Sequence, residues 1–300
     1  MSYHTSVLLH ECIEGLSIKE DGIYVDLTFG GGGHSGEILK KLTTGHLYAF
    51  DQDRDVLANA ENIDNRSFTL IQSNFRYLKK YLKFHGIQKV DGILADLGVS
   101  SHQIDQPERG FSTRFDGPLD MRMDQSSSKT AASVINNYEE KDLHRILGMY
   151  GEVRNAKTLA AEIVRQRTGK AIDTIEDLKN VISKFAPRGR HNKYFAQVFQ
   201  AIRIEVNEEL TALEEMLEQS QDVLNPGGRI AIISFHSLED RLVKNFFNKG
   251  KFFGEAEKDF YGNLTRPFQP VYRKPITANK KEIETNNRAR SAKLRVAEKL

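Results

Sequence analysis

The sequence has little cysteine, no tryptophan and no long apolar stretch. Because Cys12 is the only cysteine, no internal disulfide can form, and we expect a reducing compartment, most simply the cytoplasm. The early apolar cluster at residues 7–9 is broken by His10 and Glu11 and is too short for the core of a signal peptide. No later segment is long enough to span a membrane. We therefore expect neither export nor a membrane partner.

A strong charge of one sign is also missing, since the formal net charge is +2 over 300 residues. Binding to a polyanion depends on where the charges lie, so the distribution matters more than the sum. Residues 271–300 hold nine Lys or Arg against three acids. This excess predicts either contacts to phosphates or a solvated, partly disordered tail, and charge alone does not separate the two.

The first hundred residues alternate short apolar runs with helix-like stretches, which is typical of βαβ units and a parallel sheet. We predict strands at residues 22–27, 46–50, 68–71 and 90–97, and helices at 34–42, 53–62 and 75–84. The fold class is therefore α/β.

The next clear strand, residues 229–235, follows only after a gap of more than a hundred residues and is introduced by the turn sequence Asn-Pro-Gly-Gly at 225–228. A crossover between parallel strands needs far less chain, so the gap predicts an inserted domain at 105–192. The discontinuous main domain then comprises residues 1–104 and 193–300. The helical periodicity in the gap predicts helices at residues 138–150, 155–167, 174–185 and 194–222.

The strongest local signal is the segment from Asp26 to His34, which has four successive glycines where the first strand turns into the first helix. Glycines let the backbone approach a ligand closely, and the helix beyond them offers unpaired N–H groups. A flexible surface loop is the alternative, but this position favours a cofactor loop.

The spacing of Gly31, Gly33 and Gly36, with Asp51 about twenty residues later, also satisfies a dinucleotide-binding pattern. An acid at the end of the second strand suits the ribose hydroxyls of NAD and of S-adenosylmethionine equally well. These residues therefore indicate an adenosine cofactor and leave the reaction open.

Three features favour methyl transfer. Asp26 suits a cationic sulfonium and an amino group better than a pyrophosphate. Asp96 ends the fourth strand, where ligands bind in open α/β sheets. The turn at 225–228 is similar to one common in class I methyltransferases. Taken singly, each aspartate could equally be a strand-end turn residue or a helix cap.

Six distinctive strings occur in one order, at residues 26–35, 91–101, 109–112, 116–123, 232–241 and 287–295. Together they closely resemble the bacterial 16S rRNA cytosine-N4 methyltransferase family. The resemblance implies a class I S-adenosylmethionine-dependent methyltransferase fold with an inserted all-helical domain. It also implies methylation of N4 of cytidine 1402 in the decoding region of 16S rRNA, on the assembled small ribosomal subunit.

The resemblance also implies which residues bind the cofactor: Gly32, Gly33, His34, Asp51, Phe75, Asp96 and Gln103. Asp26 is added from the charge argument above. No metal ion is required for this reaction.

Two residues are candidates for a catalytic role. Asp96 could accept a hydrogen bond from the N4–H of cytosine as positive charge develops there. It is not followed by the prolines and aromatic residue of many amino-methyltransferases, so we expect the stacking aromatic elsewhere, at Phe111 or Phe235. His236 could contact the substrate or, equally, tie a strand to a helix.

We expect phosphate contacts from six basic residues, which are Arg188, Arg190, Lys193, Arg288, Arg290 and Arg295. Two rival functions stay open: an NAD-dependent oxidoreductase, and a non-catalytic nucleic-acid-binding protein that has kept a cofactor pocket. A homodimer is compatible with the sequence, which does not determine the oligomeric state.

Overall fold

The computed structural model describes residues 6–61, 63 and 66–300. The chain forms two compact units, one made of Met1–Gly98 with Leu210–Leu300 and the other of Val99–Glu209. These bounds differ from the predicted insert at 105–192. The difference arises because helix α10 (His191–Asn207) contacts α6 (Ala131–Asn137) and α7 (Glu140–Met149) and so belongs to the helical unit.

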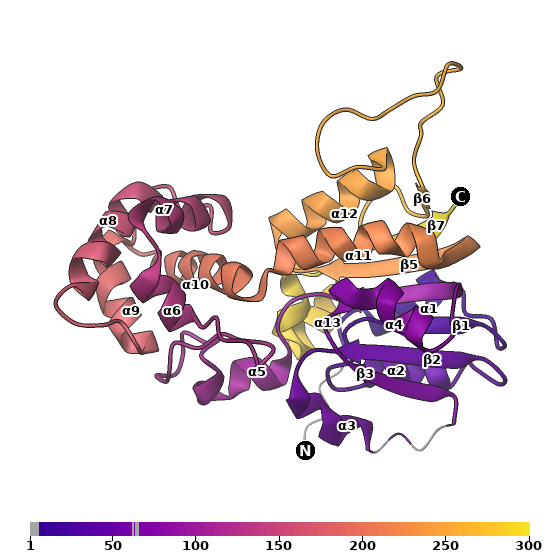
Figure 1. Ribbon diagram of the computed structural model, residues 1–300, viewed down its shortest axis with the longest axis horizontal. Helices are drawn as coiled ribbons and strands as arrows, with labels where there is room; N and C mark the ends of the chain where they lie inside the picture. The colour runs from indigo at the N-terminus through magenta and orange to yellow at the C-terminus, as the bar shows by residue number, and fades with distance from the viewer. Residues whose placement is uncertain (1–5, 62, 64–65) are drawn as a thin grey trace. The chain divides into compact units, whose positions relative to one another are not determined.

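The first unit is built on a seven-stranded sheet with the strand order β3-β2-β1-β4-β5-β7-β6 (Figure 1). Strands β1 to β5 are parallel where they pair, and β7 is antiparallel to both of its neighbours. The strands are β1 (Ile23–Asp26), β2 (His46–Asp51), β3 (Phe68–Gln72), β4 (Val90–Asp96), β5 (Leu224–Ser234), β6 (Phe268–Pro270) and β7 (Lys293–Lys299). This order is that of class I S-adenosylmethionine-dependent methyltransferases, and the predicted fold class is confirmed.

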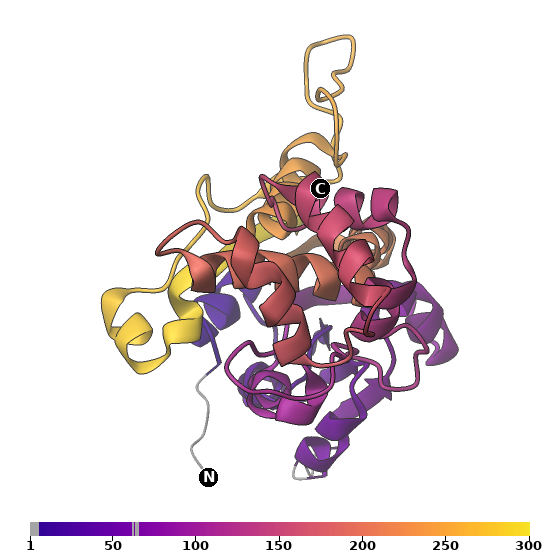
Figure 2. The same ribbon diagram turned by 90° about the vertical axis from the view of Figure 1, so that its left-hand side faces the viewer.

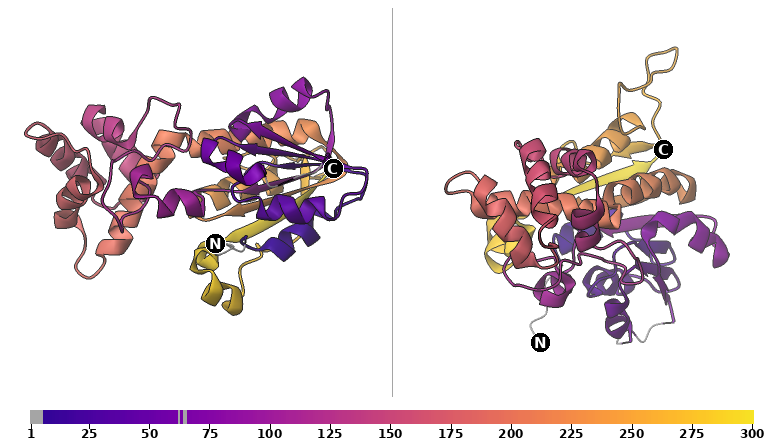
Figure 3. Two further views of the ribbon diagram at one scale, coloured as in Figure 1. Left: turned by 90° about the horizontal axis from the view of Figure 1, so that it is seen from below. Right: turned by 60° about the vertical axis from the view of Figure 1, so that its left-hand side comes forward.

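Helices cover both faces of this sheet (Figure 3). The central strand β4 is an almost continuous apolar run, because its side chains are buried on both sides. One face packs against α4 (Leu78–Phe84), α11 (Glu209–Val223) and α12 (Ser237–Lys249). The other packs against α1 (Leu9–Leu16) and α2 (Gly33–Leu39), together with residues that follow α13 (Lys280–Thr285).

The four early predicted strands agree with the structure to within one residue. The fifth, predicted at 229–235, begins five residues earlier than expected, because the turn at 225–228 does not precede a strand. It lies inside β5, where the register jumps from Val90 paired with Leu224 to Gly92 paired with Arg229. Residues 225–228 therefore form an irregularity in the strand, and Gly227 allows it with a φ of 76°.

The basic C-terminal segment completes the sheet. β7 lies between β5 and β6, with Leu294 and Val296 buried. The alternative of a disordered tail is therefore wrong for residues 293–299. Its charges gave no sign of this, because Leu294, Val296 and Ala297 are buried while the charged residues of β7 between and beyond them stay partly exposed.

The second unit is all-helical (Figure 2). It has its own core, formed by apolar residues from every one of its longer helices. Capping boxes begin α5 at Ser100 and α6 at Thr130. Its helices are α5 (Ser101–Asp105), α6, α7, α8 (Ala156–Arg167), α9 (Ile175–Ile182) and α10, with 3-10 turns η3 (Pro107–Arg109) and η4 (Ser183–Phe185).

The single helix predicted for 194–222 is wrong. α10 ends at Asn207, Glu208 adopts a left-handed φ of 51°, and α11 begins at Glu209. The Asn207 side chain donates to the carbonyl of Met121 and accepts from the N–H of Met123, which ties the end of α10 to its own unit. No glycine or proline marks this break in the sequence.

The helix predicted for 53–62 is shorter than expected, consisting of the 3-10 turn η1 (Arg54–Val56) and α3 (Leu57–Ala60), and Asn62 lies outside the described residues. Asp53 caps this segment by accepting from the N–H of Asp55. Over the part of the chain that is described, no helix combines the length and apolar character needed to cross a membrane.

Candidate active site

Three aspartates end neighbouring strands at one edge of the sheet: Asp26 on β1, Asp51 on β2 and Asp96 on β4. The connection leaving β1 leads to β2 on one side, while β4 joins on the other, so the strand order reverses between β1 and β4. Open α/β sheets bind ligands outside the carboxyl ends of the strands at such a point. The fold thus brings together the three acids that the sequence singled out.

The glycine loop after β1 is held in place by backbone contacts to β2. The N–H of Gly30 donates to Asp51 Oδ2 at 2.8 Å, and the N–H of Phe29 donates to the Phe50 carbonyl at 2.9 Å. Gly32 has a φ of 76°, which a side chain would strain. A Cβ built on Gly31 would meet nothing within 4 Å, so the outer side of the loop is open to a ligand.

Asp26 is fully buried beneath this loop. Its Oδ1 accepts from the N–H of Thr28 at 3.1 Å, and its Oδ2 accepts from Ser35 Oγ at 2.7 Å. Burial raises the pKa of Asp26, although nearby His34 when protonated and these hydrogen bonds oppose the shift. The geometry does not support the predicted direct contact with the cofactor, because Asp26 has no exposed surface and holds the loop instead.

Asp51 connects the loop to the second strand. Its Oδ1 accepts from the N–H of Asp53 at 2.9 Å, while its Oδ2 accepts from Gly30. Burial raises the pKa of Asp51 to about 6, against the effect of these two hydrogen bonds. At neutral pH it is mostly ionised, and each oxygen retains a lone pair for a hydroxyl donor.

His34 opens α2 and is buried between the N-terminal segment and Asp96. Its Nε2 lies 3.1 Å from the Val7 carbonyl, which can only accept, so Nε2 carries the proton. Burial lowers the pKa of His34 in spite of the Asp26 charge, and the ring is neutral at pH 7. Its Nδ1 then turns a lone pair toward Asp96 Oδ2, at 4.0 Å, beyond hydrogen-bond length.

Asp96 is the least satisfied of the three acids. Its backbone N–H donates to Thr28 Oγ1 at 2.6 Å, but its side-chain Oδ1 is buried without a hydrogen-bond partner among the described residues. Burial, followed by the charges of Asp26 and Glu239, raises the pKa of Asp96 to about 8. Although Oδ1 is buried, 24% of the Asp96 side chain is still exposed, so the rest of the side chain is accessible to a ligand.

The two remaining residues of the predicted cofactor set lie on different units. Phe75 is half-buried at the start of the 3-10 turn η2 (Phe75–Tyr77), which Asn74 caps by accepting from the N–H of Arg76. Gln103 belongs to the helical unit, where its side chain accepts from the N–H of Ser100 in the capping box of α5. The structure therefore gives Gln103 a local role of its own.

His236 is a helix cap. Its Nδ1 accepts from the N–H of Glu239 at 3.4 Å, while Glu239 Oε2 accepts from the N–H groups of Phe235 and His236. Glu239 Oε1 also lies 3.2 Å from His236 Nε2. These contacts tie a strand to a helix. The Nε2 atom is buried without a hydrogen-bond partner among the described residues, so the predicted substrate contact of His236 stays a prediction.

The whole sequence is similar to proteins of one known family. The MraW methylase family matches the whole chain, residues 1–300. The chain belongs to this family. Ribosomal RNA small subunit methyltransferase H of Cytophaga hutchinsonii is 63% identical over 297 residues, which is 99% of each chain. The protein of the same name from Flavobacterium johnsoniae is 58% identical, over 100% of this chain and 99% of its own.

Family membership and the class I fold settle the cofactor that the glycine spacing left open. This methylase uses S-adenosylmethionine, and the rival interpretation as an NAD-dependent oxidoreductase is set aside. Sequence reasoning missed two members of the site, Thr28 and Ser35, whose hydroxyls hold Asp96 and Asp26. Both residues lie within the glycine-loop segment at residues 26–35, and this position could have indicated them as members of the site.

The six predicted phosphate-binding residues fall into two groups. Arg188, Arg190 and Lys193 are exposed around the start of α10, beside a shallow hollow of about 370 Å³. Arg290 is also exposed, and Arg288 is half-buried in the 3-10 turn η5 (Asn287–Ser291).

Arg295 differs from the other five. Its Nε donates to Asp240 Oδ1 at 2.7 Å, and only 13% of its side chain is exposed. This pair ties β7 to α12. The geometry does not support the predicted phosphate contact by Arg295.

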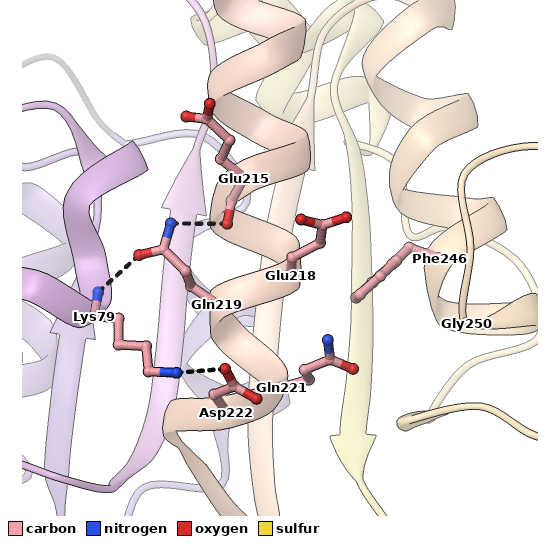
Figure 4. A pocket seen from close by; sticks show the side chains of 8 residues that line it. All are labelled: Lys79, Glu215, Glu218, Gln219, Gln221, Asp222, Phe246 and Gly250. Carbon is pink, nitrogen blue, oxygen red and sulfur yellow. Dashed lines mark hydrogen bonds and ion pairs between the residues drawn. The ribbon is translucent and has the colours of Figure 1, made fainter.

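A second hollow of about 440 Å³ lies between α4, α11 and α12 (Figure 4). Lys79 donates to Asp222 there, and the Gln219 side chain accepts from the N–H of Lys79. The hollow contains none of the residues predicted to bind the cofactor, so it is separate from the methylase site.

Proposed function

We propose that this methylase transfers a methyl group from S-adenosylmethionine to the exocyclic N4 of cytidine 1402 in 16S rRNA, on the assembled small subunit. The observation that carries the proposal is the Asp96 carboxyl, which ends β4 beside the glycine loop with one buried oxygen unsatisfied. A buried carboxyl oxygen without a partner is costly and predicts a hydrogen-bond donor in the bound ligand. The amino group of cytosine is such a donor.

The residues of the site fit S-adenosylmethionine. Gly32, Gly33 and His34 form the turn into α2, where only glycine leaves room, since a Cβ on Gly33 would overlap Ser6 Oγ. Asp51 is ionised and placed to accept from ribose hydroxyls. Phe75 offers a half-buried ring for the adenine, and Gln103 is the last member of the proposed cofactor set.

The chemical difficulty is that the N4 lone pair of cytosine is delocalised into the ring. S-adenosylmethionine supplies an electrophilic methyl group, so the chain's own residues need only hold the base in line and stabilise the charge that develops on N4. An ionised Asp96 would accept one N4–H and favour its loss as a proton. His34 lies next to Asp96 and is neutral, so it does not compensate the charge of the Asp96 carboxylate, which acts as the base in the site.

Recognition of the RNA is assigned to the helical unit and the C-terminal region. Arg188, Arg190 and Lys193 would contact phosphates from the start of α10, and Arg288 and Arg290 from η5. Phe235, or Phe111 of the helical unit, would stack on the displaced base.

The decisive experiment is methyl transfer from labelled S-adenosylmethionine to small subunits isolated from cells that lack this gene. We expect stoichiometric incorporation, and N4-methylcytidine on nuclease digestion and mass spectrometry. Incorporation at another atom would overturn the proposed target. Binding to the subunit with no incorporation would instead support a non-catalytic RNA-binding protein.

A further inference from the structure

The short helix α4 carries a surface that the cofactor site does not use. Residues 74–90 contain five Lys or Arg and no acidic residue. We name the outward-pointing part of this segment the α4 outer face, and it consists of Tyr77, Lys80, Lys83, Phe84 and His85, all of which are exposed.

The other sides of the segment contact the core and helix α11. Leu78 and Leu82 are fully buried in the core. Arg76 Nε donates to Glu215 Oε2 at 2.6 Å, and Lys79 Nζ donates to Asp222 Oδ2 at 2.7 Å, both on α11 (Figure 4 shows the Lys79 contact). These pairs neutralise only the side of α4 that faces α11.

The α4 outer face combines free cations with exposed rings. Phe84 is 82% exposed and Tyr77 47%. Lys80 Nζ lies 5.7 Å from the centre of the Tyr77 ring, and the spacing of residues 77, 80 and 84 places them along one side of the helix. In the described part of the chain, neither Lys80 nor Lys83 is ion-paired.

These exposed rings contribute little to the core, so their position needs another explanation. Single-stranded nucleic acid is bound by this combination, in which cations follow the phosphates and aromatic faces stack on bases. Protein interfaces, by contrast, are depleted in lysine. The lysines therefore favour a nucleic acid over a protein.

We propose that the α4 outer face is a second RNA-binding site that holds an unpaired segment of small-subunit rRNA. Lys80 and Lys83 contact phosphates, while Phe84 and Tyr77 stack on bases. The proposal rests on the proposed function for the identity of the RNA, and it adds a contact outside the methyl-transfer site.

The test compares the full-length wild-type chain with Phe84→Ala and with the double variant Lys80→Gln/Lys83→Gln. Binding to protein-free 16S rRNA and to a short oligouridine is measured by fluorescence anisotropy over a range of salt concentrations. We expect Phe84→Ala to weaken binding about tenfold. The double variant should lower the slope of log Kd against log salt by about 1.4, the value for two phosphate contacts on a single strand.

Two matched controls come from the same unit. Phe253 is also exposed, at 71%, and Lys244 and Lys258 are exposed lysines away from α4. Phe253→Ala and Lys244→Gln/Lys258→Gln should leave both the affinity and the salt slope near those of the wild type. Equal losses in the control and α4 variants would mean unspecific charge or aromatic effects and would overturn the proposal.

A second readout separates this site from the methylation chemistry. On intact small subunits, the α4 variants should raise KM about tenfold and leave kcat unchanged. If they bind protein-free rRNA like the wild type but lose affinity for intact subunits, the partner is a ribosomal protein and the proposal is wrong. Failure of the wild type to methylate subunits would contradict the proposed function alone, because the binding measurements would still test the surface.

Discussion

Two carboxyls of the site, those of Asp51 and Asp96, have different pKa values because their surroundings differ. Asp51 accepts two backbone N–H groups, which limits the rise of its pKa to about 6. Asp96 has no such donors on its side chain to oppose burial, which together with the charges of Asp26 and Glu239 raises its pKa to about 8. At neutral pH the first acts as a hydrogen-bond acceptor, while the second holds a proton that must leave before it can act as a base.

Methyl transfer should therefore depend on pH through Asp96. Below pH 8 the protonated carboxyl is a weak acceptor, so the single-turnover rate should rise with pH and level off above about 8. Asp96→Asn should lower the rate on the order of a hundredfold and abolish this rise. Quenched-flow incorporation of labelled methyl between pH 6 and 9 provides the measurement, and a flat wild-type profile would contradict the assignment.

The same carboxyl should make the fold sensitive to pH. The folded pKa of Asp96 lies above its usual value of 3.8, so the folded state holds the proton more tightly and stability falls as pH rises from about 4 to 8. Asp96→Asn removes this penalty. We expect it to stabilise the protein by about 1–2 kcal/mol at pH 8 and by much less at pH 4, as measured by urea unfolding. A stabilisation that is equal at both pH values would exclude ionisation as its cause.

Adding one methyl group at Gly31 tests whether the open side of the glycine loop binds the cofactor. Gly31→Ala adds a Cβ that meets no protein atom within 4 Å at a position without positive φ, so the free energy of unfolding should not change. The methyl group should occupy space meant for S-adenosylmethionine and weaken its binding at least tenfold in isothermal titration. Gly36→Ala, which is equally unobstructed but lies within α2, is the matched control and should bind normally.

Among the elements, β7 depends on an ion pair that the sequence did not reveal. Burial alone would raise the pKa of Asp240, but hydrogen bonds from Arg295 and Lys293 outweigh it and lower that pKa. The pair spans 55 residues of chain and joins α12 to the last strand.

Removing one partner of this pair should destabilise the fold. We expect Arg295→Ala to cost about 1–3 kcal/mol, because it leaves a half-buried carboxylate without its main donor. A double-mutant cycle with Asp240→Ala should recover a coupling energy of about 1 kcal/mol or more. RNA affinity should stay unchanged. A loss of affinity without a loss of stability would restore Arg295 to the phosphate-binding set.

The elements differ in how far the sequence determines them. The four early strands were predictable because their apolar runs are short, buried and separated by turn signals, as at Val90–Asp96. The break at Glu208 was not, because a side chain of Asn207 bonded to a distant loop causes it. Likewise the three acids were predictable as strand ends, whereas the sequence left two roles open for His236, because its capping contact depends on where Glu239 folds back.

At the scale of the whole molecule, the two units have separate cores. The helical unit has its own buried apolar residues and its own helix caps, so residues 99–209 expressed alone should give a helical circular dichroism spectrum and unfold cooperatively on heating. A non-cooperative transition would show that this core needs the remainder of the chain.

The position of β7 also bears on synthesis of the protein. β7 is synthesised after β5 and β6, yet in the finished sheet it lies between them rather than at an edge. β5 therefore has an open side until β7 has been made, and the sheet closes only after that strand has emerged. A chain that stops before residue 293 would have an exposed strand edge and be prone to aggregation, rather than being a slightly shortened enzyme.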